Sequence, residues 1–261
     1  MKKKIVLMLT VIMLIGLAGC GKNQINIKET GTSDNNEQMV QNIYENKRTE
    51  VKQKISEIKE RLPETSAEDK GTCGSKAKWY YKDNTLIIYG EGVITEDTWH
   101  KSNIVINTVV IDSGITKLGN NMFSGLGAEV GKNIENFYIA DGLEEIGSST
   151  FVNCDCLSEI VLPPSLYFID GYTFASCDSL KNVYMTDGVE KIGDSAFTGC
   201  KSLDSIFIPK TVLAIGNGVF TGCNNLSDIQ ISKDNRIFSE KNNCIITVSY
   251  THLRAHETAA N

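Results

Sequence analysis

Apolar residues between positions 151 and 231 recur in a fixed order. A phenylalanine, a cysteine and five further apolar residues follow one another at steps of 3, 3, 3, 2, 4 and 3, and the next phenylalanine comes five residues later. The period is therefore 23 residues. The sets are Phe151, Cys154, Leu157, Ile160, Leu162, Leu166, Ile169; Phe174, Cys177, Leu180, Val183, Met185, Val189, Ile192; Phe197, Cys200, Leu203, Ile206, Ile208, Val212, Ile215; and Phe220, Cys223, Leu226, Ile229, Ile231.

A repeat of this length predicts a solenoid, in which each short unit buries its apolar face only by stacking on its neighbours. The step of 2 places two side chains on one face of a strand, and the steps of 3 suit tight turns. The same pattern runs back to Ile106, with about five residues inserted near Gly127 to Gly131 as a longer turn. Six strands are predicted, at 109–111, 137–139, 160–162, 183–185, 206–208 and 229–231.

The repeat resembles the BspA-like subfamily of bacterial leucine-rich repeats, which reads roughly L-x-x-I-x-I-P-x-x-V-x-x-I-G-x-x-A-F-x-x-C. Leu203 to Gly216 and Ile192 to Cys200 match this pattern. The resemblance covers residues 71 to 246 and implies a leucine-rich-repeat solenoid, mostly β and turn, at a bacterial cell surface. A role in adhesion is also implied by the resemblance and not by composition.

The N-terminus has the pattern of an export signal. Three lysines precede an apolar run that is too short to span a membrane comfortably, and Leu17-Ala18-Gly19-Cys20 resembles a bacterial lipobox. This resemblance implies cleavage after residue 19 and acyl chains on Cys20, which would hold the protein on the extracytoplasmic face of the cell membrane. The alternatives are an ordinary signal peptide and an uncleaved anchor.

Residues 20–36 are polar and are expected to form a tether, and residues 37–62 show a helical pattern that ends before Pro63. Arg48 interrupts the apolar stripe, which makes a long coiled coil doubtful. We expect a single spacer helix, with a short self-associating stalk as the alternative. The apolar residues of the stripe are Tyr44, Val51, Ile55, Ile58 and Leu62.

Residues 63–70 form a charged linker, and residues 71–103 are expected to cap the array. Two β-rich runs on either side of Lys82-Asp83-Asn84 predict a hairpin in this cap. Trp79 and Trp99 are expected in its core, and the alternative is that they are platforms for a ligand.

The repeats are expected over 104–246, although the pattern fails at Asn235, which stands where a valine is due. Residues 247–261 resemble translated sequencing-adapter read-through, so we leave them out of the fold. The alternative is a genuine tail. If the run is read-through, the natural protein continues past about Val248 and this chain is a fragment.

Composition narrows the class of protein. The 261 residues are 41% hydrophobic, enough for a real core. The formal net charge is −6 and becomes −9 if Lys2, Lys3 and Lys4 are removed with the signal, which argues against nucleic acid as a partner.

Four of the eight cysteines occupy one repeat position, 23 residues apart. Neighbouring strands lie about 4.8 Å apart, so their thiols could approach one another. We expect a ladder of buried free thiols, with disulfides or a metal site as alternatives. The four residues are Cys154, Cys177, Cys200 and Cys223.

The repeats contain no catalytic set and no expected cofactor or metal site. His100, in the expected cap, is the only histidine before residue 247. The repeats therefore offer no histidine base for a Ser-His-Asp triad or a Cys-His dyad. Gly147, Gly193 and Gly216 follow the repeat isoleucine and are expected to be turn glycines with positive φ, with Asp170 at that place in one copy. An enzyme is therefore not expected.

The residue between the two inward-facing residues of each strand points out of the core. These positions make an exposed row of aromatic and β-branched side chains, which is typical of a protein-binding surface. The alternative is that β-propensity alone selects such residues. The row begins at Val110, and the candidate ligand-binding residues are Tyr138, Val161, Tyr184, Phe207 and Gln230.

Together these observations predict a lipid-anchored, non-enzymatic binding or adhesion module that recognises a protein or a glycan through its strand face. Two rivals remain open. One is the targeting arm of a larger enzyme whose catalytic domain lies outside this chain, and the other is a structural spacer in the cell envelope.

Overall fold

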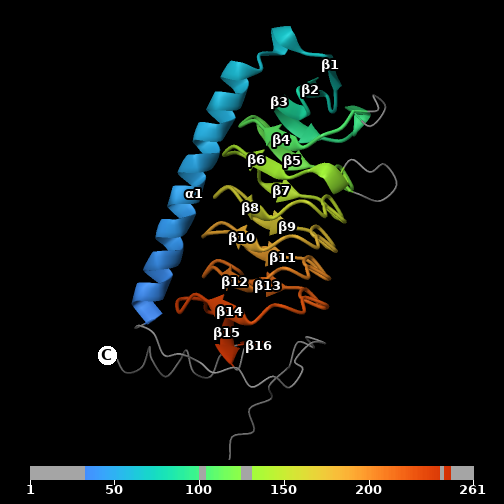
Figure 1. Cartoon of the computed structure of the whole chain (residues 1–261). Coiled ribbons are helices and arrows are strands. Elements are labelled where there is room, and N and C mark those ends of the chain that lie inside the picture. Colours follow the sequence, from blue (N-terminus) through green and yellow to red (C-terminus); the bar gives the residue numbers. More distant parts are fainter. Residues whose placement is uncertain (1–32, 100–103, 125–130, 242–243, 248–261) are drawn as a thin grey trace, which may run out of the picture.

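The computed structural model describes residues 33–99, 104–124, 131–241 and 244–247. It shows a stack of strand-and-turn repeats with one long helix, α1 (Ser33–Arg61), lying along its side (Figure 1). The predicted signal, Cys20, His100, most of the inserted turn near Gly127 and the tail from 248 lie outside the described residues.

The predicted solenoid is confirmed, and its six predicted strands lie within one residue of their expected positions. Parallel pairing aligns equivalent positions of neighbouring turns, so Val109 stands beside Phe137 and Phe207 beside Gln230. We call the outward side of these strands the strand face. The strands are β4 (Thr108–Ile111), β6 (Asn136–Ile139), β8 (Glu159–Val161), β10 (Asn182–Tyr184), β12 (Ser205–Ile208) and β14 (Asp228–Ile231).

A second parallel sheet, which the sequence did not predict, forms the opposite side of the stack. Most of its strands have only two residues, of which one side chain points inward, as Ile192 does beside Lys191. The sequence had indicated only turns at these places. The strands are β5 (Ile115–Leu118), β7 (Glu145–Ile146), β9 (Phe168–Ile169), β11 (Lys191–Ile192) and β13 (Ala214–Ile215).

The predicted hairpin closes the N-terminal end of the stack. β2 (Lys76–Lys82) and β3 (Thr85–Ile94) are antiparallel, and β1 (Asp69–Thr72) adds a third strand. Asp83 and Asn84 both have positive φ, as a two-residue hairpin turn of type I′ requires. β3 is long enough to pair with both β4 and β5, so it starts both sheets.

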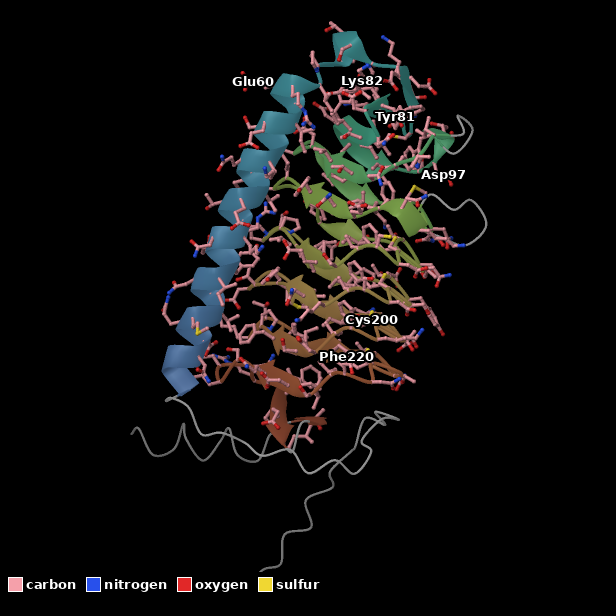
Figure 2. The ribbon with its side chains drawn as sticks, in the orientation of Figure 1. Glu60, Tyr81, Lys82, Asp97, Cys200 and Phe220 are labelled. Atoms are coloured by element: carbon pink, nitrogen blue, oxygen red, sulfur yellow. The ribbon has the colours of Figure 1, made fainter. Side chains whose placement is uncertain are left out.

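Stacked aromatic rings run through the core between the two sheets. Phe174 lies 5.0 Å from the ring of Phe151 and 5.2 Å from that of Phe197, with nearly parallel planes. The two tryptophans of the cap are buried as expected, and Trp99 extends the stack at 5.4 Å from Phe123. Figure 2 labels Phe220, the last ring of this column.

A column of thiols runs beside the rings. Cys154, Cys177, Cys200 and Cys223 are free and buried, in agreement with the expected thiol ladder. Each Sγ donates to the carbonyl oxygen of the ring residue in the preceding turn, at 3.3, 2.9, 3.1 and 3.0 Å. These contacts satisfy the weak S–H donor inside an apolar core.

The expected role of the repeat glycines is wrong. Gly147, Gly193 and Gly216 do not have φ in the left-handed region. A Cβ at Gly193 would lie 2.5 Å from the backbone nitrogen of Gly171, so glycine is needed because neighbouring turns approach closely. The left-handed position lies two residues later, at Ser149 and Ser195.

Asn235 explains why the pattern fails near the end. Its buried side-chain amide donates to the carbonyl oxygens of Pro209 and Val212 and accepts from the backbone N–H groups of Ile237 and Phe238. A polar side chain at a valine position thus links the last turn to the antiparallel pair β15 (Phe238–Lys241) and β16 (Cys244–Thr247).

α1 lies against the strand face and does not project from the array as a spacer. A short 3-10 turn (Glu64–Ser66) connects it to β1, and a second one (Gly131–Asn133) precedes β6. The helix starts beside β14 and ends beside the cap, so it runs opposite to the direction in which the turns succeed one another (Figure 1). Its apolar stripe is buried within the same chain and is not free for a self-associating stalk.

Candidate functional site

The candidate ligand-binding residues share one face, as predicted, but that face is not exposed. Val161 is only 4% exposed and Val110 is fully buried, because α1 covers them. Tyr138, Tyr184 and Phe207 are half-buried, as is Gln230 on the last turn. The structure therefore corrects the expected exposure of the strand face, and a ligand-binding role for these five residues stays a prediction.

The inward side of α1 is built by a regular spacing of buried residues. Steps of 4, 3, 4, 3 and 4 keep one stripe of a helix pointing in a single direction. The apolar members pack against Tyr80, Ile87, Val110 and Val161, with Tyr138 and Tyr184 at the margin. The members of the stripe are Tyr44, Arg48, Val51, Ile55 and Ile58, and Leu62 continues it directly after the helix.

Arg48, which interrupts the apolar stripe, has a specific place in the structure. Its Nη1 donates to the carbonyl oxygen of Ile139 at 2.9 Å, and its Nη2 forms an ion pair with Asp141. Lys52 also pairs with Asp141, at 2.8 Å. Although burial alone would raise the pKa of Asp141, hydrogen bonds and charges from Lys52 and Arg48 hold that pKa below its usual value.

Two more lysines of α1 pair with acids at the ends of strands. Lys47 lies 3.0 Å from Glu159, and Lys59 lies 2.5 Å from Asp112. A basic edge of the helix thus follows an acidic edge of the strand face. Since these side chains are partly exposed, each pair contributes about 1 kcal/mol or less and fixes register more than stability.

A polar cleft of about 360 Å³ lies at the seam between α1 and the first strands. Tyr138 and two threonines provide hydroxyl groups, while the helix provides both charges. Burial raises the pKa of Tyr138, so its hydroxyl stays protonated at neutral pH. The lining residues are Lys54, Glu57, Ile58, Arg61, Thr85, Thr108 and Tyr138.

The outward side of the second sheet carries exposed apolar side chains. We call it the second-sheet surface and define it by Tyr167, Phe168, Lys191 and Leu213. Tyr167 is 40% and Leu213 is 57% exposed. Lys191 Nζ stands 4.8 Å from the centre of the Phe168 ring, a cation–π contact.

A polar network borders this surface. The Tyr167 hydroxyl donates to Glu145, which Lys117 also contacts at 2.5 Å. These contacts hold the pKa of Glu145 below its usual range, chiefly through the hydrogen bond from Lys117. Sequence reasoning missed the surface because the second sheet was not predicted. The outward residue before each repeat isoleucine or leucine was the signal that could have revealed it.

The described residues include no group of three side chains able to hold a metal ion. Burial raises the pKa of the Cys177 thiol, which keeps it protonated and unreactive. Among the helices of the described ranges, none is both long and apolar enough to cross a bilayer.

A comparison with protein families finds a match to the repeats. Residues 127–245 match a family model described as BspA type leucine rich repeat region, in six copies. No curated protein matches the sequence.

A solved structure shows the same fold. A leucine-rich repeat protein from Eubacterium ventriosum is 23% identical, with a TM-score of 0.58 over 68% of this chain and 47% of its own. A leucine rich cell surface protein from Faecalibacterium prausnitzii is 21% identical, with a TM-score of 0.49 over 72% of this chain and 60% of its own. The chain thus spans about half the length of these relatives.

Proposed function

We propose that the chain is a non-enzymatic binding or adhesion module, and the match of residues 127–245 to the BspA-type leucine-rich repeat model supports this proposal. Its ligand is an extracellular protein or glycan. Acyl chains on Cys20 hold the module on the extracytoplasmic face of a bacterial membrane. The lipobox-like Leu17-Ala18-Gly19-Cys20 supports the anchor.

The observation that carries the binding role is the exposed apolar character of the second-sheet surface. Exposed aromatic side chains among charged groups are typical of surfaces that bind other molecules. α1 covers the strand face, so recognition through Tyr184 or Phe207 would first require the helix to leave. We therefore propose that the ligand binds at Tyr167, Phe168, Lys191 and Leu213.

Capture of a defined panel tests the binding role. The chain from residue 20 onward is applied to immobilised extracellular-matrix proteins and cell-surface glycans, and bound protein is measured as a function of concentration. Saturable capture by one member of the panel is expected. If the chain binds every surface equally or none at all, the proposed function is wrong.

Paired variants then locate the binding surface. Tyr167→Ala with Leu213→Ala should abolish capture, because both side chains are exposed and their loss leaves the core intact. Tyr184→Ala with Phe207→Ala is the matched control on the strand face and should leave capture unchanged. The opposite result would place recognition under α1.

The anchor is tested separately. A Cys20→Ser variant expressed in a bacterial host should be released into the medium, since no thiol remains to carry the acyl chains. Retention of this variant in the membrane fraction would contradict lipidation.

A further inference from the structure

The contacts of α1 with the array follow a strict reverse order. Near its start, Glu37 accepts a hydrogen bond from Ser232 in the last turn, and Gln41 accepts one from Thr186. In the middle of the helix, Tyr44 Oη donates to the carbonyl oxygen of Leu162.

The same order continues to the end of the helix. Arg48 reaches Ile139, and Lys59 reaches Asp112. Beyond the helix, the carbonyl oxygen of Leu62 accepts a hydrogen bond from Tyr80 in the cap. α1 thus spans the array from its last turn to its cap in a direction antiparallel to the turns.

This direction fixes where the N-terminal attachment meets the array. A helix of 29 residues is about 44 Å long at 1.5 Å per residue. The thirteen steps from Cys20 to Ser33 reach at most about 45 Å, whatever their conformation. The segment from Cys20 therefore joins the array at its β14 end, and only a fully extended segment that runs back along the whole helix would bring the attachment level with the cap.

We propose that α1 is a fold-back strap that orients the array on the membrane, so that β14 lies nearer the bilayer than the N-terminal cap does. The proposal rests on the lipid anchor of the proposed function. A projecting spacer helix would give the reverse order, because it would bring the cap nearer to the bilayer than the last turn.

The two halves of α1 are held against the array by different kinds of contact. The C-terminal half of the helix carries the buried residues Val51, Ile55 and Ile58, which seal it to the first strands. In the N-terminal half only Tyr44 is buried in the same way, Met39 and Ile43 are exposed, and the turns before Tyr44 are held by the polar contacts of Glu37 and Gln41. The strap is therefore fixed firmly at the cap and more loosely at the end nearest the membrane.

Fluorescence energy transfer from a donor on the protein to an acceptor dye in the membrane tests the orientation of the array. The experiment does not require acyl chains on Cys20. The chain from residue 20 onward carries an N-terminal polyhistidine tag and is bound to vesicles that contain a nickel-chelating lipid and an acceptor dye. Cys20, Cys156 and Cys244 are replaced by serine. A donor dye is placed at Asn224→Cys in the last turn or at Lys78→Cys in the cap, both exposed positions.

Transfer at Asn224→Cys should be several times stronger than transfer at Lys78→Cys. Equal transfer at the two sites, or stronger transfer at Lys78→Cys, would overturn the strap. Because the tag replaces the lipid, this result is independent of whether Cys20 is acylated, which the Cys20→Ser release experiment decides.

A release variant gives the second readout. Arg48→Ala with Ile55→Asp removes the buried cation and puts a charge into the apolar seam, so α1 should detach and the order of transfer should reverse. Continued protection of the Cys177 thiol from alkylation shows that the array remains folded. If the array stays folded and transfer at Asn224→Cys is still stronger than at Lys78→Cys, α1 does not set the orientation of the array on the membrane.

Discussion

Asn235 allows a sharp prediction, because the substitution that restores the repeat pattern should destabilise the protein. Val212 holds the equivalent position one turn earlier, so Asn235→Val makes the last turn resemble its neighbours. The repeat pattern alone predicts that this change makes the protein more stable. The structure predicts the opposite.

The magnitude follows from the hydrogen bonds of the buried amide. Asn235 Nδ2 lies 2.9 Å from the Pro209 oxygen and 3.1 Å from the Val212 oxygen, while Oδ1 accepts from the N–H groups of Ile237 and Phe238. The Pro209 oxygen keeps a bond from the Val212 N–H. Valine would thus leave up to three buried groups unpaired, at roughly 1–3 kcal/mol each.

Burial of the valine side chain offsets about 1.5–3 kcal/mol of this loss. We therefore expect a net decrease of about 3 kcal/mol in the free energy of unfolding, measured by urea denaturation followed by circular dichroism. Asn225→Val is the matched control, because Asn225 is exposed and makes one hydrogen bond, to the Lys201 carbonyl oxygen. The control should change stability by about 0.5 kcal/mol or less. Equal effects of the two variants, or a more stable Asn235→Val chain, would refute the reasoning.

Three further predictions concern the ring column, the strap and the thiols. Phe174→Ala removes a fully buried ring from the middle of the stack and should cost about 3–5 kcal/mol in urea denaturation. The lowered pKa of Asp141 stabilises the folded state above the unfolded pKa of about 4, and this contribution is lost as pH falls through the folded value. Asp141→Asn should therefore reduce the acid sensitivity of α1 docking, measured by fluorescence transfer between the helix and the array. Among the cysteines with described side chains, only exposed Cys156 should react quickly with a thiol reagent in the native chain, whereas Cys177 should react after denaturation, as mass spectrometry can show.

The sequence predicted the parts of the fold that depend on local periodicity. A step of 2 at Ile206 and Ile208 marks a strand because alternation places both side chains on one face, and β12 contains both. The pair Lys191–Ile192 carries only one inward residue, which periodicity cannot distinguish from a turn, so the second sheet was missed. The wrong prediction of positive φ at Gly147, Gly193 and Gly216 has a similar cause. Spacing shows that a small residue is needed, but it does not show whether a positive φ or a close backbone contact requires it.

The candidate site shows the limit of periodicity more clearly. The stripe of α1 was recognised from Val51 and Ile55, but a stripe indicates only that a helix needs an apolar partner. Tyr138 and Tyr184 likewise indicate only that the strand face is apolar. Taken alone, the stripe predicts a spacer helix and the strand face predicts a ligand surface, whereas in the structure the two surfaces cover each other. Arg48 was the one residue that argued against a partner helix, and it fits the carbonyl oxygen and the acid that this array presents.

This mutual covering changes how the repeat array should behave as a folding unit. In a bare solenoid each turn contacts only its neighbours, so stability is close to a sum of local terms and the ends can fray independently. α1 contacts the last turn at Ser232 and the cap at Tyr80, and it therefore links turns that do not touch one another. The helix adds contacts between distant parts of the chain, which raises the cooperativity of unfolding and slows folding. The last turn consequently depends both on Asn235 within the array and on a helix that is anchored at the opposite end.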